Sequence, residues 1–268
     1  MSDLDSGIPM IKTDKLIFEI DGLVVPSEKV IEWEYKRLIK TYKVLKNIAN
    51  ISDDSSFDEW MKQKNVEAMQ NEVLRIKMNI GLDQLRNHLK KKSALGNFGS
   101  VIATKISQGK RKYSMTEIVV PNSDLEPHEV MQRITEIMMK NNQVHLAMNL
   151  GSNPDHYVLQ SITPTIQEVV EVTGGSPLPT HFFAHYGDEE GLQSKLTPGY
   201  EVQAAGSARL ENGTIIGGVR HQVKKEENGF RFKALVEFPS ILPNYMIQQH
   251  QLHLACEFGH WISDILND

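Results

Sequence analysis

The 268-residue sequence is poor in several features that would quickly assign it to a class of protein. It has one cysteine, Cys256, so no disulfide can form within the chain. Its net charge of −5 argues against nucleic acid as the main partner, because phosphate binding requires positive charge. No apolar run approaches the roughly 18 residues that span a bilayer. The acidic start MSDLDSG also lacks the basic and apolar regions of a signal peptide. We therefore expect a cytoplasmic protein with neither nucleic acid nor a membrane as partner.

The most informative stretch that is present is the C-terminal segment 245–266, whose spacing predicts a long helix. At about 100° per residue, four potential metal ligands fall within an arc of about 80°, namely His250, His253, Glu257 and His260. His253 and Glu257 have the spacing at which a helix presents two ligands to zinc. A histidine on a helix is as often solvated or hydrogen-bonded in a core, so a metal site requires further ligands from elsewhere.

Two kinds of pattern divide the rest of the chain. Residues 28–50 and 56–80 repeat apolar positions at three- and four-residue steps, which predicts amphipathic helices, and the pattern resumes as far as Lys92. Residues 181–239 alternate apolar and polar positions around two Asn-Gly turns, which is typical of β-hairpins. Between them, residues 90–116 contain seven Lys or Arg and no Asp or Glu. We expect a solvated loop there, between strands at 101–106 and 112–120.

These patterns predict an α+β fold with two regions. Residues 1–92 form a helical region, and its apolar stripes at 31–45 and 60–80 are expected to join two copies of the chain as a homodimer, because two helices cannot close a core alone. Residues 93–268 form a helix-grip domain of the Bet v 1 and START type, in which an antiparallel sheet surrounds the last helix. A cavity between sheet and helix would adjoin the His/Glu face.

Four features in this order resemble the diacetylphloroglucinol hydrolase and phloretin hydrolase family: NPDH at 153–156, VVEVTGG at 169–175, hairpins with Asn-Gly turns, and HLACE at 253–257. The resemblance covers about residues 140–268. It implies a zinc-dependent hydrolase that cleaves a carbon–carbon bond of an acylated phenol or related aromatic ketone. It also implies a zinc site of two histidines and two glutamates, here His156, Glu171, His253 and Glu257. His145 and Glu168 are the alternatives for the upstream pair, and His250 or His260 would support the ligands.

Cleavage of a carbon–carbon bond needs a proton donor, because the leaving carbon must be protonated. The candidates are His221 and His185, on strands expected to line the cavity, and a tyrosine hydroxyl could bind a phenol. Tyr157, Tyr186 and Tyr200 could supply that hydroxyl. The alternative function is a non-catalytic helix-grip module that binds a small aromatic or lipid ligand, and a third possibility is a structural dimer built on the long helices.

Overall fold

The computed structural model describes residues 7–51 and 55–267, and these form one antiparallel sheet of nine strands with seven α-helices. The strand order is β2-β1-β3-β9-β8-β7-β6-β5-β4, and every neighbouring pair is antiparallel. The strands are β1 (Ile17–Ile20), β2 (Leu23–Val25), β3 (Arg111–Pro121), β4 (His156–Thr163), β5 (Ile166–Glu171), β6 (Thr180–Tyr186), β7 (Val202–Arg209), β8 (Ile215–Glu226) and β9 (Gly229–Pro239).

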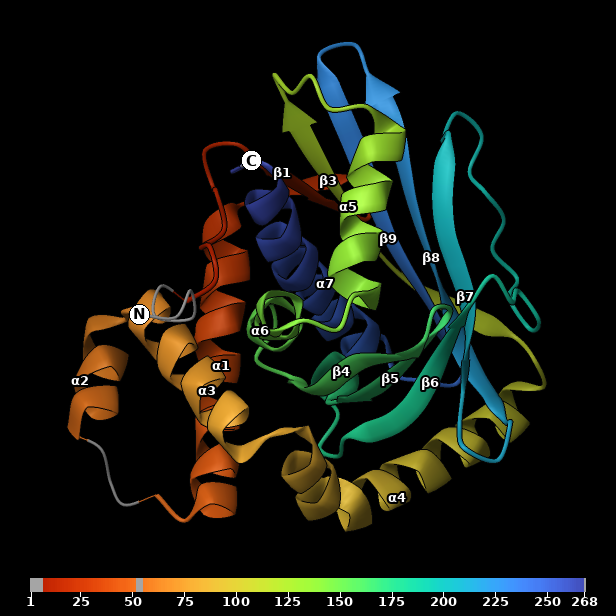
Figure 1. Cartoon of the computed structure of the whole chain (residues 1–268). Coiled ribbons are helices and arrows are strands. Elements are labelled where there is room, and N and C mark those ends of the chain that lie inside the picture. Colours follow the sequence, from red (N-terminus) through yellow and green to blue (C-terminus); the bar gives the residue numbers. More distant parts are fainter. Residues whose placement is uncertain (1–6, 52–54, 268) are drawn as a thin grey trace.

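The C-terminal helix α7 occupies the centre of the molecule (Figure 1). It packs against β3, with α5 on one side and α1 on the other, while α4 runs along the end of the sheet near β6. Sixteen of its 22 residues are buried, so α7 forms the middle of the core. The helices are α1 (Ser27–Ala49), α2 (Ser55–Gln63), α3 (Val66–Ile80), α4 (Leu82–Ser107), α5 (Pro127–Met139), α6 (Gln143–Gly151) and α7 (Asn244–Ile265).

The long last helix and the hairpin strands agree with the sequence patterns. Gly213 lies in the β7–β8 turn and Gly229 begins β9 at the other turn, and both have positive φ, at 82° and 123°. Only glycine adopts such backbone angles without strain, which explains why the Asn-Gly pairs mark these turns. The mixture of helices with an antiparallel sheet and a C-terminal helix is therefore confirmed. Among residues 7–51 and 55–267, no helix combines the length and apolar character that crossing a bilayer requires.

The apolar stripes of the N-terminal helices are buried within the chain. Leu38 and Leu45 of α1 pack in one cluster with Val73 and Ile76 of α3 and with Val158 of β4. The predicted dimer contact through these stripes is therefore wrong, because the partner of the two helices is the chain's own sheet. Self-association itself stays a prediction. The large apolar side chains that do face solvent include four on α4, namely Leu95, Phe98, Ile102 and Ile106.

The region around residue 92 also differs from expectation. Helix α4 continues through the basic segment to Ser107, so residues 101–106 are helical and not a strand. The expected boundary between residues 92 and 93 thus falls inside a helix, and β1 and β2 belong to the same sheet as the later strands. The predicted helix 56–80 is two helices, because Lys64 has a φ of 53° and the Asn65 side chain then caps α3 by accepting from the amide of Ala68.

Candidate metal centre and cavity

Four potential metal ligands converge at one point beside α7. His156 is the first residue of β4 and Glu171 the last of β5, and antiparallel pairing places these two residues opposite each other. His253 and Glu257 lie one turn apart on α7 and complete the group. The resemblance assigned these same four residues to the metal, and the structure brings them together.

The Nε2 atoms of the two histidines lie close to both carboxylates, and two overlapping groups of three, His156/His253/Glu257 and Glu171/His250/His253, could each hold a metal ion. The Nε2 atoms of His156 and His253 are 3.2 Å apart. His156 Nε2 lies 3.6 Å from Glu171 Oε2 and 3.8 Å from Glu257 Oε1. His253 Nε2 lies 3.9 Å from Glu171 Oε2 and 3.7 Å from Glu257 Oε2. Four ligands in a tetrahedron at zinc's usual bond lengths are about 3.4 Å from one another. The histidine–histidine and histidine–carboxylate distances are close to this spacing.

The other ring nitrogen is hydrogen-bonded in His156 and lies near a carboxylate, without a hydrogen bond, in His253. His156 Nδ1 lies 2.9 Å from the carbonyl of Asn149, which places the proton on Nδ1 and leaves the Nε2 lone pair facing the centre. His253 Nδ1 lies 3.9 Å from Asp155 Oδ2, and neither atom has a hydrogen-bond partner. Arg37 holds the other oxygen of Asp155 at 2.6 and 2.8 Å. A carboxylate behind a ligating histidine is the usual support of a metal site.

Burial controls the charge of all four groups. It lowers the pKa of His253 to about 3 and that of His156 well below its ordinary value, so both rings are neutral. Burial raises the pKa of Glu171 to about 7, and burial together with Glu171 raises that of Glu257 well above its ordinary value. Without a cation the centre does not favour two ionised carboxylates. A divalent ion would be neutralised by them, so the donor set fits such an ion.

The centre forms part of the wall of a cavity of about 340 Å³ between the sheet, α4 and α7. Its lining is mainly apolar, with Leu159, Val169, Phe182 and Phe258 among the contributors. Among the described residues, no lysine or arginine lines it. The cavity therefore suits an uncharged, largely apolar molecule of drug-like size.

Two of the three predicted catalytic residues line the cavity, and the third points to the opposite face of its strand. Tyr186 on β6 and His221 on β8 line the cavity, as expected. His185 does not line it, because successive side chains on β6 point to opposite faces and its neighbours Ala184 and Tyr186 face the cavity. The cavity role of His185 is therefore corrected. Among the tyrosines, Tyr157 packs in the N-terminal cluster and Tyr200 donates to Glu117, so neither lines the cavity.

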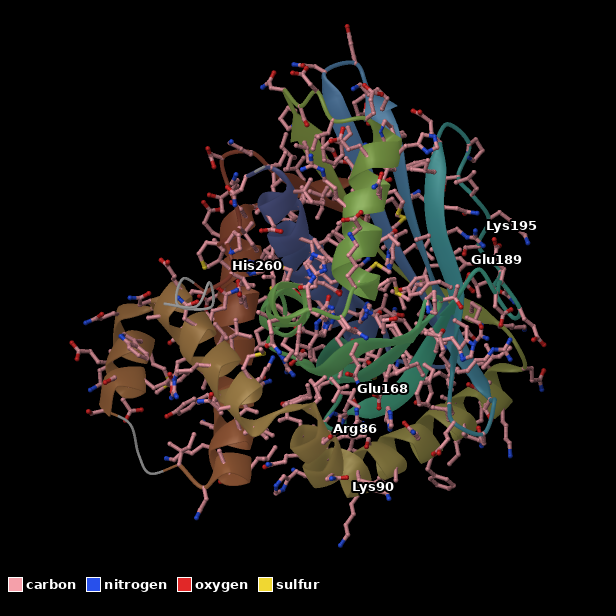
Figure 2. All side chains as sticks on the ribbon, in the orientation of Figure 1. Arg86, Lys90, Glu168, Glu189, Lys195 and His260 are labelled. Carbon is pink, nitrogen blue, oxygen red and sulfur yellow. The ribbon has the colours of Figure 1, made fainter. Side chains whose placement is uncertain are left out.

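The two alternative upstream ligands lie away from the centre. His145 sits on α6 and bonds to Asn142 at the start of that helix. Glu168 binds Arg86 and His181 on the other side of the strand (Figure 2). Although burial opposes ionisation, these hydrogen bonds lower the pKa of Glu168 to about 2. Glu168 therefore belongs to a separate ion pair.

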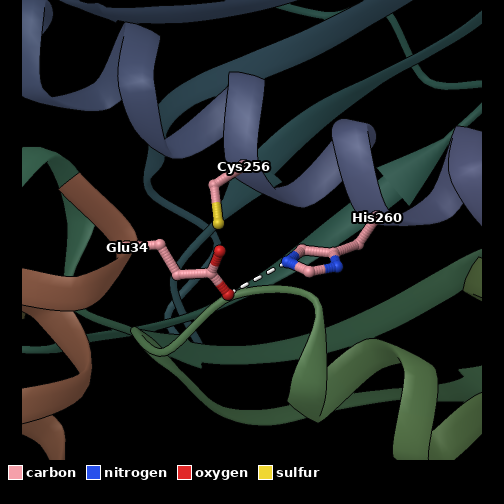
Figure 3. Close-up of side chains that lie close together, drawn as sticks. All are labelled: Glu34, Cys256 and His260. Atoms are coloured by element: carbon pink, nitrogen blue, oxygen red, sulfur yellow. Dashed lines mark hydrogen bonds and ion pairs between the residues drawn. The ribbon is translucent and has the colours of Figure 1, made fainter. Parts of the chain in front are cut away.

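His250 adjoins the centre, whereas His260 does not support it. The ring of His250 stacks on His253 at 4.8 Å and lines the cavity. His260 lies near Glu34 and Cys256 (Figure 3), with Nε2 3.0 Å from Glu34 and Nδ1 2.8 Å from the carbonyl of Pro9. Burial disfavours a charged ring, but Glu34 and Pro9 raise the pKa of His260 above its ordinary value. His260 therefore does not support the candidate ligands as expected and instead forms a buried ion pair with Glu34 of α1.

Sequence reasoning missed the polar residues of α1 that reach the site. Glu34, Arg37 and Thr41 are buried, and Thr41 donates to the carbonyl of Pro154. Their spacing of three and four residues puts them on one helix face. The same spacing within an apolar stripe was visible in the sequence and could have indicated buried polar contacts.

Comparison of the chain with protein-family models gives no match, and comparison with curated proteins gives none either.

Proposed function

We propose that the protein is a zinc-dependent hydrolase of helix-grip fold that cleaves the carbon–carbon bond between an acyl group and an electron-rich aromatic ring, or a related ketone. The observation that carries this proposal is the convergence of His156, Glu171, His253 and Glu257 in the wall of an apolar cavity. Zinc bound there would supply a Lewis acid that polarises the ketone and lowers the pKa of water. The reaction consumes one water, whose oxygen goes to the acyl carbon while a proton goes to the ring carbon.

In this proposal, residues of the chain itself bind the substrate and hold the proton that the leaving carbon receives. Tyr186 lies near Glu171 and Glu257, and burial together with these carboxylates raises its pKa, so its hydroxyl keeps its proton at neutral pH. We assign Tyr186 as the residue that holds a proton beside the leaving carbon. Burial lowers the pKa of His221 to about 3, so its ring is neutral. A neutral ring cannot donate as imidazolium, and we assign His221 to hydrogen bonding with a substrate oxygen.

The apolar lining of the cavity favours a neutral aromatic ketone over a charged substrate. The lining has apolar side chains and no lysine or arginine among the described residues, so a carboxylate or phosphate substrate would lack a counter-ion. A flat ring fits between aromatic and aliphatic walls, with its carbonyl directed at the metal centre. The same cavity would also serve a binding module, and turnover separates these two functions.

The deciding experiment mixes purified protein with monoacetyl- and diacetylphloroglucinol and, separately, with aryl esters, with and without a chelator. Release of acetate from the ketones that is lost with chelator and restored by zinc is the expected result. The variant His253→Ala, Glu257→Gln should be inactive, whereas Glu168→Gln, which removes a carboxylate outside the centre, should remain active. Turnover of esters alone would indicate a plain esterase. Binding of the ketones without turnover would favour the binding module.

A further inference from the structure

The indole of Trp261 carries a hydrogen-bond donor without a partner in the protein. Trp261 is 2 % exposed, and its Nε1 atom is buried and makes no hydrogen bond within the described chain. By contrast, Trp33 Nε1 donates to Gln249 at 3.1 Å. A buried donor that stays unpaired costs free energy, and such groups usually have a role that the isolated chain does not show. Trp261 is also a cavity-lining residue, so a ligand can reach its surroundings.

The position of Trp261 relates its donor to the metal centre. His253, Glu257 and Trp261 follow each other at four-residue steps along α7, and all three line the cavity. The backbone rises about 6 Å between Glu257 and Trp261, a distance comparable with the width of one substituted aromatic ring. The ring of Phe258 meets Trp261 edge-on, with ring centroids 5.0 Å apart. Along α7, Trp261 thus lies beyond Glu257 by about the width of one aromatic ring.

A second unpartnered group also packs against Phe258. His221 packs against Phe258 with ring centroids 4.7 Å apart, and its Nδ1 atom is buried without a hydrogen-bond partner. An indole N–H can only donate, whereas a neutral imidazole offers one donor and one acceptor. Together they match the hydrogen-bonding capacity of a hydroxyl or carbonyl oxygen, and not that of an ammonium group.

We propose that Trp261 Nε1 and His221, which both adjoin Phe258, form an oxygen-binding subsite that receives a neutral hydroxyl or oxo substituent of the aromatic ring. The inference rests on the proposed function and narrows it. Trp261 is then a specificity-determining residue: rings that carry oxygen at this position are selected over rings that do not. An anionic substituent is disfavoured, because the described lining offers it no cation.

The test observes the indole N–H directly and does not depend on turnover. The chain has three tryptophans, so a ¹⁵N-labelled sample gives three indole signals, which Trp→Phe variants assign. Chelator-treated protein is titrated with 2,4,6-trihydroxyacetophenone and with acetophenone. We expect the Trp261 signal to move downfield and to exchange more slowly with deuterium in the first complex only. An unchanged signal at saturation, equal changes with both compounds, or no binding of the hydroxylated compound would overturn the proposal.

A substitution gives an independent measurement. Trp261→Phe removes the N–H and should lower the preference for the hydroxylated over the plain ketone by about 2- to 10-fold, the range of one hydrogen bond. Trp60→Phe is the matched control, since Trp60 lies on α2 outside the cavity lining, and its preference should equal that of the parent. A preference unaltered by Trp261→Phe contradicts the subsite. Because binding is measured without metal, a failure here is distinct from absence of zinc-dependent turnover.

Discussion

In the metal-free protein, one carboxyl group of the candidate centre should make a contribution to stability that falls as pH rises from 5 to 8, opposite in sign to that of the buried histidines, whose pKa is lowered. This group is Glu171, which is buried in the centre and whose pKa burial raises from 4.5 to about 7. A carboxyl group with a raised pKa in the folded state contributes stability that is complete below its unfolded pKa. That contribution is lost as pH rises through the folded pKa. The window for Glu171 therefore runs from about pH 4.5 to about pH 7.

The size of the effect follows from the two pKa values. A rise from 4.5 to about 7 corresponds to about 3 kcal/mol at full extent, of which about 2.5 kcal/mol is lost between pH 5 and pH 8. For a chain of this length, that loss of the Glu171 contribution corresponds to about 5–10 °C in Tm. Stoichiometric zinc should reverse the trend, because ligand carboxylates bind the ion only when deprotonated and protons compete less as pH rises.

The assay is thermal unfolding, followed by circular dichroism at pH 5 and pH 8, of protein treated with chelator or loaded with zinc. Glu171→Gln has no carboxyl group to titrate at this position, whereas Glu257 and the buried histidines are common to it and the parent. The difference in Tm between the metal-free parent and metal-free Glu171→Gln should therefore change by about 5–10 °C between pH 5 and pH 8. Glu168→Gln is the matched control three residues away on the same strand, and its difference from the parent should not change in this range because the pKa of Glu168 lies at about 2. The reasoning is refuted if the difference between the parent and Glu171→Gln is constant with pH, or if zinc leaves the profile of the parent unchanged.

Three further results are expected. The double variant His253→Ala, Glu257→Gln should retain no stoichiometric zinc after gel filtration, and retention of one equivalent would contradict the ligand assignment. Asp155→Asn should weaken zinc binding by about 10- to 100-fold, measured by competition with a chromophoric chelator, because the support behind His253 is lost; unaltered affinity would show that Asp155 serves only Arg37. Glu34→Gln should lower the free energy of unfolding in urea by about 3 to 5 kcal/mol at pH 6, because a charged His260 loses its partner. The difference from the parent should shrink above the raised pKa of His260, and a difference that is constant with pH would argue against the ion pair.

The four candidate ligands could be named from the sequence, two of them through local geometry and two through the family resemblance. His253 and Glu257 share a face through helix periodicity alone, and the NPDH and VEVTGG segments supplied the other pair through the family resemblance. His185 failed for a physical reason: alternation on a strand shows which residues share a face but not which face is inward. Ala184 and Tyr186, not His185, face the cavity. Only the pairing of β6 with β5 and β7 fixes that choice.

The error at residues 101–106 shows the limit of composition as a guide. The segment VIATKI is rich in β-branched residues and was expected to be a strand, yet it completes α4. Burial supplies the reason, since Ala103 packs inward and lines the cavity while Ile102 and Ile106 face solvent. Gly96 in the same helix approaches Pro179 so closely that a Cβ atom would lie 2.1 Å from its carbonyl oxygen. Contacts between residues so far apart in the chain cannot be recognised from a short stretch of sequence.

The N-terminal helices form the back wall of the metal centre. Arg37 of α1 holds Asp155, which faces His253, and Glu34 of the same helix pairs with His260 of α7. Lys77 of α3 is fully buried and donates to the carbonyls of Leu150 and Asn153, in the segment that precedes His156. Arg37 and Glu34 would each be costly alone, and each has a charged partner, Asp155 in the loop between α6 and β4 and His260 on α7. Burial lowers the pKa of Lys77 to about 7, and its ammonium donates to two backbone carbonyls. Removing α1–α3 would therefore leave His260 and Asp155 as uncompensated buried groups, so these helices and the metal centre depend on each other for folding.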